Sequence, residues 1–226
     1  MACQLYLVAP DSLLKGETAP DDFIPLLQAI LKNTEIACFL LPGKPGTDEQ
    51  SVEMVTRLCS VVQDAGVAFL LEDAPEQVRR YEADGVHLGD AADFKTARAE
   101  LGPNYIVGVD CGVSRHAALV SGDGDKAHVG ADYVAFNNRK PLPEFSDPEV
   151  QAFEEDGPKG NELLQWWQTM MTVPCVAMDN STLEDAIAQA ESGADFIAVQ
   201  SCVWSHSAGP EAALAELSAA LQKLGD

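Results

Sequence analysis

Short apolar runs alternate with amphipathic helical patterns along the whole chain, and this alternation constrains the fold more than any other feature. The apolar runs cover residues 5–8, 36–41, 67–71, 85–88, 105–109, 133–136, 174–178 and 196–199. They are nearly continuous in apolar residues, which is typical of parallel strands that helices cover on both faces. Helical patterns follow at 21–31, 48–65, 93–101, 115–120, 183–192 and 210–224. The order of these elements predicts a single (β/α)8 TIM barrel over residues 1–226.

An open doubly wound sheet is the alternative arrangement for the same alternation. Such sheets commonly carry a Gly-x-Gly-x-x-Gly turn after the first strand, where a dinucleotide binds. No such turn follows residues 5–8, so the sequence favours the closed barrel.

The segment 138–160 interrupts the pattern after the sixth predicted strand. It is acidic, and its breaking residues are Pro141, Pro143, Pro148, Gly157 and Pro158. This composition predicts a long loop at the carboxyl end of the barrel, either a lid over the site or a disordered segment.

The balance of charge restricts the partners. The chain has 36 acidic and 14 basic residues, for a net charge of −22, which disfavours nucleic acid and anionic membrane surfaces. No apolar run approaches the roughly 20 residues that span a bilayer, and the first residues lack a signal-peptide pattern, so we expect a cytoplasmic protein. The six cysteines form no CxxC pair, and those in or at the ends of apolar runs are expected to be free and buried: Cys38, Cys111, Cys175 and Cys202.

Several stretches of the sequence resemble the thiamine phosphate synthases, a family that includes a closely related thiazole tautomerase. They are residues 5–8, 83–89, 108–109, 130–134 and 192–196, which read LYLV, ADGVHLG, GV, GADYV and SGADF. The resemblance implies a transferase of thiamine biosynthesis that joins a pyrimidine pyrophosphate to a thiazole phosphate, with Mg²⁺, and releases pyrophosphate. It also implies small-molecule phosphorylated substrates, and a homodimer stays open as the assembly.

The resemblance implies metal ligands among the carboxylates that follow the third and fourth strands. Asp73 matches the metal-binding aspartate of the family, whereas Ala92 occupies the position of the second one. Asp90 or Asp93 is expected to substitute for it, because Mg²⁺ prefers oxygen ligands. The alternative for Asp93 is a helix N-cap.

The resemblance also places basic and polar groups where phosphates would bind. Lys44, Arg139 and Lys140 are the candidate catalytic residues, and the alternative for Lys44 is a solvated loop lysine. The candidate substrate- and phosphate-binding residues are Asn137, Asn180, Ser181 and Ser201. For Asn180 and Ser181 the alternative is the cap of the helix that follows.

Acidic residues stand where the family carries neutral or glycine residues. They are Glu72, Asp90, Asp110 and Asp179, and a site lined in this way favours a cation or a neutral polar ligand over pyrophosphate. The alternative hypothesis is therefore a catalytically degenerate paralogue that binds a small ligand or a partner. A third is a different barrel reaction with Asp110 or Asp179 as general base.

Position along the chain makes a geometric prediction about these groups. We expect Asp73, Asp90, Asp110, Asp179 and Ser201 to converge at one end of the barrel, because each follows or closes a strand. Two histidines also lie in the barrel pattern. His87 lies within a strand and is expected in the barrel core, and His116 is a weak counterpart of the tautomerase histidine.

Overall fold

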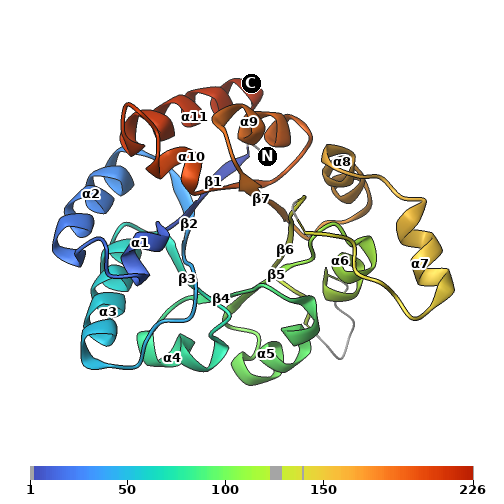
Figure 1. Cartoon of the computed structure of the whole chain (residues 1–226), viewed down its shortest axis with the longest axis horizontal. Coiled ribbons are helices and arrows are strands. Elements are labelled where there is room, and N and C mark those ends of the chain that lie inside the picture. The colour runs from blue at the N-terminus through green and yellow to red at the C-terminus, as the bar shows by residue number, and fades with distance from the viewer. Residues whose placement is uncertain (1–2, 123–128, 139, 226) are drawn as a thin grey trace.

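Eight parallel strands close into a barrel in sequence order, with β8 paired back to β1 (Figure 1). The structure is a computed structural model that describes residues 3–122, 129–138 and 140–225, without the side chains of Leu14 and Asp179. Helices surround the barrel, as the alternation of the sequence predicts. The TIM-barrel prediction is confirmed, and the open sheet is ruled out.

The strands lie within about two residues of their predicted positions. They are β1 Gln4–Val8, β2 Ile36–Leu41, β3 Ala68–Glu72, β4 Gly85–Leu88, β5 Ile106–Asp110, β6 Tyr133–Phe136, β7 Cys175–Asn180 and β8 Phe196–Val199. The largest difference is in β7, which continues to Asn180 because its register with β8 shifts between Ala177 and Asn180.

The helices include several short ones that the sequence did not reveal. The α-helices are α1 Asp11–Leu14, α2 Pro20–Asn33, α3 Glu49–Asp64, α4 Val78–Tyr81, α5 Phe94–Leu101, α6 Arg115–Gly122, α7 Pro148–Glu155, α8 Asn161–Met170, α9 Leu183–Glu191, α10 Ser201–Trp204 and α11 Pro210–Gly225. The 3₁₀ helices are η1 Pro75–Gln77 and η2 Ala91–Asp93. Among the helices in the described ranges, none has the length and apolar character needed to cross a bilayer.

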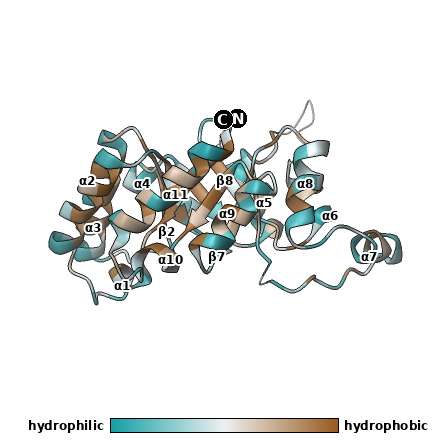
Figure 2. Ribbon diagram, turned by 90° about the horizontal axis from the view of Figure 1, so that it is seen from above, coloured by the Kyte–Doolittle hydropathy of each residue, from teal (hydrophilic) through white to brown (hydrophobic). Residues whose placement is uncertain are grey.

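A helix occupies part of the segment 138–160, where we expected only a loop. α7 lies outside the ring of barrel helices (Figures 1 and 2). Its N-terminus is specified locally, since Pro148 takes the first helical position and the Asp147 carboxylate accepts the Glu149 N–H at 2.9 Å. The prediction of a continuous loop is therefore wrong over Pro148–Glu155.

The buried carboxylate of Glu154 fastens α7 to the start of α6. It accepts hydrogen bonds from Ser114 Oγ at 2.6 Å and from the backbone N–H groups of Arg115 at 3.0 Å and His116 at 2.7 Å. These N–H groups have no partner within their own helix, so Glu154 caps α6 from a distant part of the chain. The partners of Glu154 lie far from it in the sequence, so the acidic composition of residues 138–160 by itself indicates only a loop.

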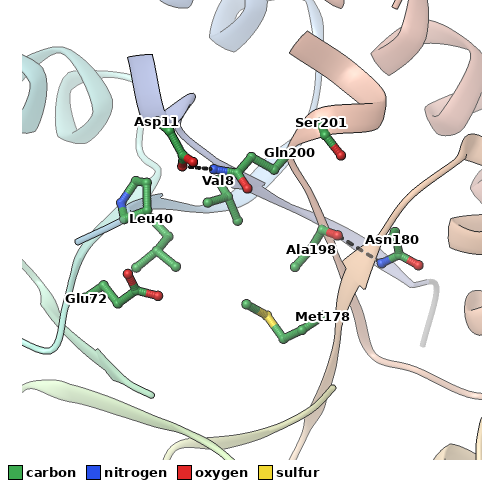
Figure 3. A pocket seen from close by; sticks show the side chains of 10 residues that line it. Val8, Asp11, Leu40, Glu72, Met178, Asn180, Ala198, Gln200 and Ser201 are labelled. Carbon is green, nitrogen blue, oxygen red and sulfur yellow. Dashed lines mark hydrogen bonds between the residues drawn. The ribbon is translucent and has the colours of Figure 1, made fainter. Parts of the chain in front are cut away.

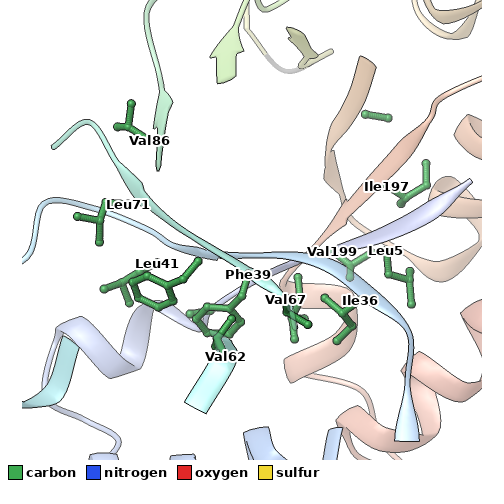
Figure 4. Packing of buried hydrophobic residues seen from close by; sticks show 14 of the residues in the cluster. Leu5, Ile36, Phe39, Leu41, Val62, Val67, Leu71, Val86, Ile197 and Val199 are labelled. Carbon is green, nitrogen blue, oxygen red and sulfur yellow. The ribbon is translucent and has the colours of Figure 1, made fainter. Parts of the chain in front are cut away.

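The strands are apolar throughout because both of their faces pack against apolar side chains. Outward-facing side chains pack beneath the helices, as Phe39 and Leu41 of β2 do near Val62 of α3 (Figure 4). Inward-facing side chains such as Tyr6 and Cys38 form a second cluster inside the barrel. Alternate residues of each strand therefore face different cores, and both faces exclude water.

Polar rings fill the centre of the barrel without charge. The Tyr133 hydroxyl lies 2.9 Å from the Tyr6 hydroxyl and 2.9 Å from His87 Nδ1. Burial lowers the pKa of His87 to about 4, so the imidazole is neutral at pH 7. The Tyr133 ring lies against Gly108, where a Cβ atom would be 1.8 Å from the ring. His87 is a core residue, as expected.

A repeated Ala-Asp pair closes the amino end of the barrel before β4, β6 and β8. Each aspartate accepts a hydrogen bond from a backbone N–H near the start of the preceding strand: Asp84 from Phe69 at 2.7 Å, Asp132 from Val107 at 2.8 Å and Asp195 from Cys175 at 2.8 Å. The motifs that carry the family resemblance at these three places therefore join neighbouring strands, far from the carboxyl end.

Candidate active site

A pocket of about 220 Å³ opens at the carboxyl ends of β1, β2, β3, β7 and β8 (Figure 3). Its polar lining residues are Asp11, Glu72, Asn180, Gln200 and Ser201. Its apolar lining residues include Val8, Leu40, Met178 and Ala198. None of the lining residues in the described part of the chain is a lysine or an arginine, so the pocket offers hydrogen-bond acceptors beside an apolar floor.

The two carboxylates of the pocket are held by neighbouring groups. Glu72 accepts the Gly43 N–H at 2.6 Å, and burial raises the pKa of Glu72 above its ordinary value. Asp11 accepts a hydrogen bond from Gln200 Nε2 at 2.9 Å. Asp11 and Gln200 are not among the residues predicted from the sequence, although Gln200 directly follows β8 and that position could have revealed it.

Asn180 links β7 to β8 and lines the pocket. Its Nδ2 donates to the carbonyl oxygens of Ala177 at 3.1 Å and Ala198 at 2.9 Å, across the register shift. Its buried Oδ1 has no hydrogen-bond partner among the described residues. The capping alternative for Asn180 is wrong, because Thr182 caps α9 through the Asp185 N–H at 3.0 Å.

Lys140 lies at the carboxyl end of the barrel on the opposite side, by β4, β5 and β6. Its Nζ donates to Asp110 Oδ2 at 2.7 Å and to the Gly89 carbonyl oxygen at 2.7 Å. Asp110 Oδ1 accepts the Gly112 N–H at 2.7 Å. The structure therefore brings Lys140 to strand ends, while its neighbour Arg139 lies outside the described residues.

Lys44 projects from the loop after β2, where its exposed ammonium pairs with Glu76 of η1. This placement matches the alternative of a solvated loop lysine. Of the remaining candidates, Asn137 is buried at the end of β6, Ser181 is exposed after β7, and Ser201 lines the pocket. Among the candidates that the structure describes, Asn180 and Ser201 lie in the pocket itself.

The three carboxylates proposed as metal ligands lie in turns or at helix starts, and two of them accept hydrogen bonds from nearby backbone N–H groups. Asp73, which has a left-handed φ of 49°, accepts the Gly89 N–H at 2.7 Å. Asp90 accepts the Ala92 N–H at 2.8 Å and so caps η2. Asp93 takes the N-cap position of α5 without a capping hydrogen bond from its side chain.

These local contacts do not build a metal site. No group of three His, Cys, Asp or Glu side chains that could hold an ion occurs in the ranges that the structure describes. Within those ranges, Asp73, Asp90 and Asp93 therefore do not form a cluster of three metal-binding side chains.

A closed barrel of eight parallel strands with a polar pocket at its carboxyl end defines the general class. The chain is a (β/α)8-barrel protein whose candidate site lies where barrel enzymes bind their substrates.

Comparisons with known proteins define the family. A family model described as thiamine monophosphate synthase matches residues 5–203. The thiamine-phosphate synthase of Rhodospirillum centenum is 40% identical over 96% of both chains, and that of Hyphomonas neptunium is 38% identical over 98% of this chain and 95% of the relative. The chain belongs to the thiamine monophosphate synthase family. The expectation of a thiamine phosphate synthase-like protein of thiamine biosynthesis, of the transferase type, is thereby confirmed.

A solved structure shows the same fold. The thiamine phosphate pyrophosphorylase from Pyrococcus furiosus superposes with a TM-score of 0.70, covering 99% of this chain and 97% of its own, at 22% identity.

Proposed function

We propose that the protein joins a pyrimidine pyrophosphate to a thiazole phosphate and releases pyrophosphate. The observation that carries this proposal is the extent of the family match. It runs over residues 5–203 and so includes the carboxyl ends of all eight strands. The identity of 40% over 96% of both chains supports the same activity. The substrates are small phosphorylated molecules.

The chemistry requires a cation near the leaving group. The carbon–oxygen bond to pyrophosphate breaks while the carbon–nitrogen bond to the thiazole forms, so negative charge grows on the departing oxygen. Lys140, held at the ends of β4 and β5, supplies a positive charge at the same end of the barrel as the pocket. The pocket, with its acceptors and apolar floor, suits the uncharged part of a heterocycle.

Magnesium, a cytoplasmic location and a homodimer stay predictions from the family and the composition. Lys44, Arg139, Asn137 and Ser181 likewise stay candidate site residues. Lys140 has the catalytic role, and Asn180 and Ser201 contact the substrate.

The experiment is product formation by the purified protein. The protein is incubated with both substrates in a buffer that contains divalent cations, and thiamine phosphate is separated by chromatography and quantified. We expect product that depends on enzyme and on both substrates. The control is an active synthase, such as a protein of the same family, in the same reaction. No product above the blank while that control turns over would refute the proposed activity.

Charge in the pocket favours a second candidate, a paralogue that binds a small ligand. Asp11 and Glu72 line the pocket, and a bound pyrophosphate would meet their carboxylates at close range. Such a site suits a cationic ring instead. Calorimetric titration with thiamine, a cation, and with thiazole phosphate separates the two candidates. Binding of thiamine without turnover supports the paralogue, and turnover rejects it.

A further inference from the structure

The ammonium of Lys140 is held by two separate strand ends. Lys140 follows β6, yet its Nζ reaches Asp110 at the end of β5 and the Gly89 carbonyl after β4, both at 2.7 Å. Its stem crosses Gly112, where a Cβ atom would be 3.2 Å from Lys140 Cβ. A lysine side chain has four flexible carbons, so these contacts select one of its many conformations.

Asp110 is itself fixed. Its side chain is only 6% exposed, and its Oδ1 accepts the Gly112 N–H at 2.7 Å. Gly89 is tethered in the same way, because its N–H donates to Asp73 at 2.7 Å. The two acceptors that hold Lys140 are thus anchored before any ligand arrives.

The side chain of Lys140 stays partly open to solvent, with 41% of it exposed. An ammonium has three donors, and the two contacts account for two of them. We propose that Asp110 is a positioning residue that holds the Lys140 ammonium in place for the pyrophosphate group of the substrate. This inference rests on the proposed function, and it assigns a role to a carboxylate at a position where the family resemblance predicts serine.

The negative charge of Asp110 allows a positioning role to be distinguished from a substrate-binding role. Asp110 offsets the charge of Lys140, so it weakens the attraction of the pair for an anion in the ground state. Its benefit is geometric, because a misplaced catalytic group loses rate while binding persists. Asp110→Asn is therefore expected to lower kcat roughly 10- to 100-fold, with an unchanged or lower KM for the pyrimidine pyrophosphate.

The experiment is a double-mutant cycle on the full chain. The variants are Asp110→Asn, Lys140→Met and the double variant, with thermal unfolding as the check on folding. Asp110→Ser replaces Asp110→Asn if the latter does not fold. The matched control is Asp21→Asn, which removes an exposed carboxylate that also contacts a basic group, Arg57, at 2.7 Å. It should leave kcat and KM unchanged.

Two readouts are recorded, steady-state kinetics and calorimetric binding of inorganic pyrophosphate. If Asp110 acts through Lys140, Asp110→Asn changes either readout in the wild-type background and has no further effect in Lys140→Met. Equal effects in both backgrounds, or no effect of Asp110→Asn in either, would overturn the inference.

Failure of the proposed function has a different signature. A wild type that binds pyrophosphate with this coupling but makes no thiamine phosphate keeps the role of Asp110 and rejects the activity. A wild type that neither turns over nor binds pyrophosphate rejects both.

Discussion

Replacement of Asp132 by alanine tests whether the repeated Ala-Asp pairs hold the barrel together. Asp132 accepts the Val107 N–H at 2.8 Å and an Arg98 Nη2 hydrogen bond at 2.5 Å. The side chain of Arg98 is 9% exposed and that of Asp132 is 42% exposed. Asp132→Ala therefore leaves a nearly buried guanidinium without its carboxylate and one backbone N–H without its acceptor.

The magnitude follows from these two losses. Removing one partner of a buried ion pair costs about 3–5 kcal/mol, and the exposure of Asp132 reduces this because water reaches the pair. An unsatisfied buried N–H costs about 1–3 kcal/mol. Arg98 keeps its hydrogen bonds to the carbonyl oxygens of Gly102, Tyr105 and Gly130. We expect a loss of about 2–4 kcal/mol in the free energy of unfolding.

The assay is urea denaturation at pH 7, and the control is Asp84→Ala. Asp84 accepts the Phe69 N–H at 2.7 Å and a Gln63 amide at 3.1 Å, without an arginine, so we expect a loss of about 1–2 kcal/mol. Asp132→Ala should be the more destabilising of the two. Equal losses would refute the argument that the buried Arg98 depends on Asp132.

The remaining predictions concern a histidine and two glutamates. Burial lowers the pKa of His87 to about 4 from an ordinary 6.5, so the unfolded chain binds the proton more readily than the folded protein. The free energy of unfolding therefore falls as the pH drops from 6.5 to 4. Urea denaturation at several pH values should show a smaller fall for His87→Gln. Burial raises the pKa of Glu72, so its ionised form disfavours folding, and Glu72→Gln should stabilise the protein at pH 7 but not at pH 3. Glu154→Gln weakens the cap on α6, and limited proteolysis within 141–160 should become faster while the rest of the barrel resists; unchanged cleavage would contradict this.

The barrel could be predicted because its cause is local. Strands such as Ile36–Leu41 and Phe196–Val199 are apolar throughout. This pattern arises because both faces of each strand are buried, and it does not depend on the details of the covering helices. The Ala-Asp pairs are short-range signals as well. Their aspartates join adjacent strands, which explains why they resemble the family even where the site residues do not.

The site was harder to predict because its contacts join distant parts of the chain. The pairing of Lys140 with Asp110 depends on the path of the loop after β6, and the sequence does not specify that path. The cap that Glu154 provides for α6 depends on the docking of α7, so its charge suggested only a solvated segment. Asn180 is followed closely by a helix, so its sequence context indicates a helix cap and not a link between β7 and β8.

The expected convergence at one end of the barrel could be followed for most of its members. Asp73, Asp110 and Ser201 lie at or after the carboxyl ends of β3, β5 and β8, and Asp90 caps η2 just beyond β4. The side chain of Asp179 lies outside the described residues. The strand ends therefore gather the polar groups, but their local hydrogen bonds decide which of them are available to a ligand.

A crystal structure of the protein soaked with inorganic pyrophosphate would show directly whether Lys140 binds the leaving group. We expect phosphate density at the carboxyl end of the barrel, with an oxygen within hydrogen-bond distance of Lys140 Nζ and the contact of Lys140 with Asp110 retained. Density bound at any other face, or none there at a concentration that saturates binding in solution, would contradict it.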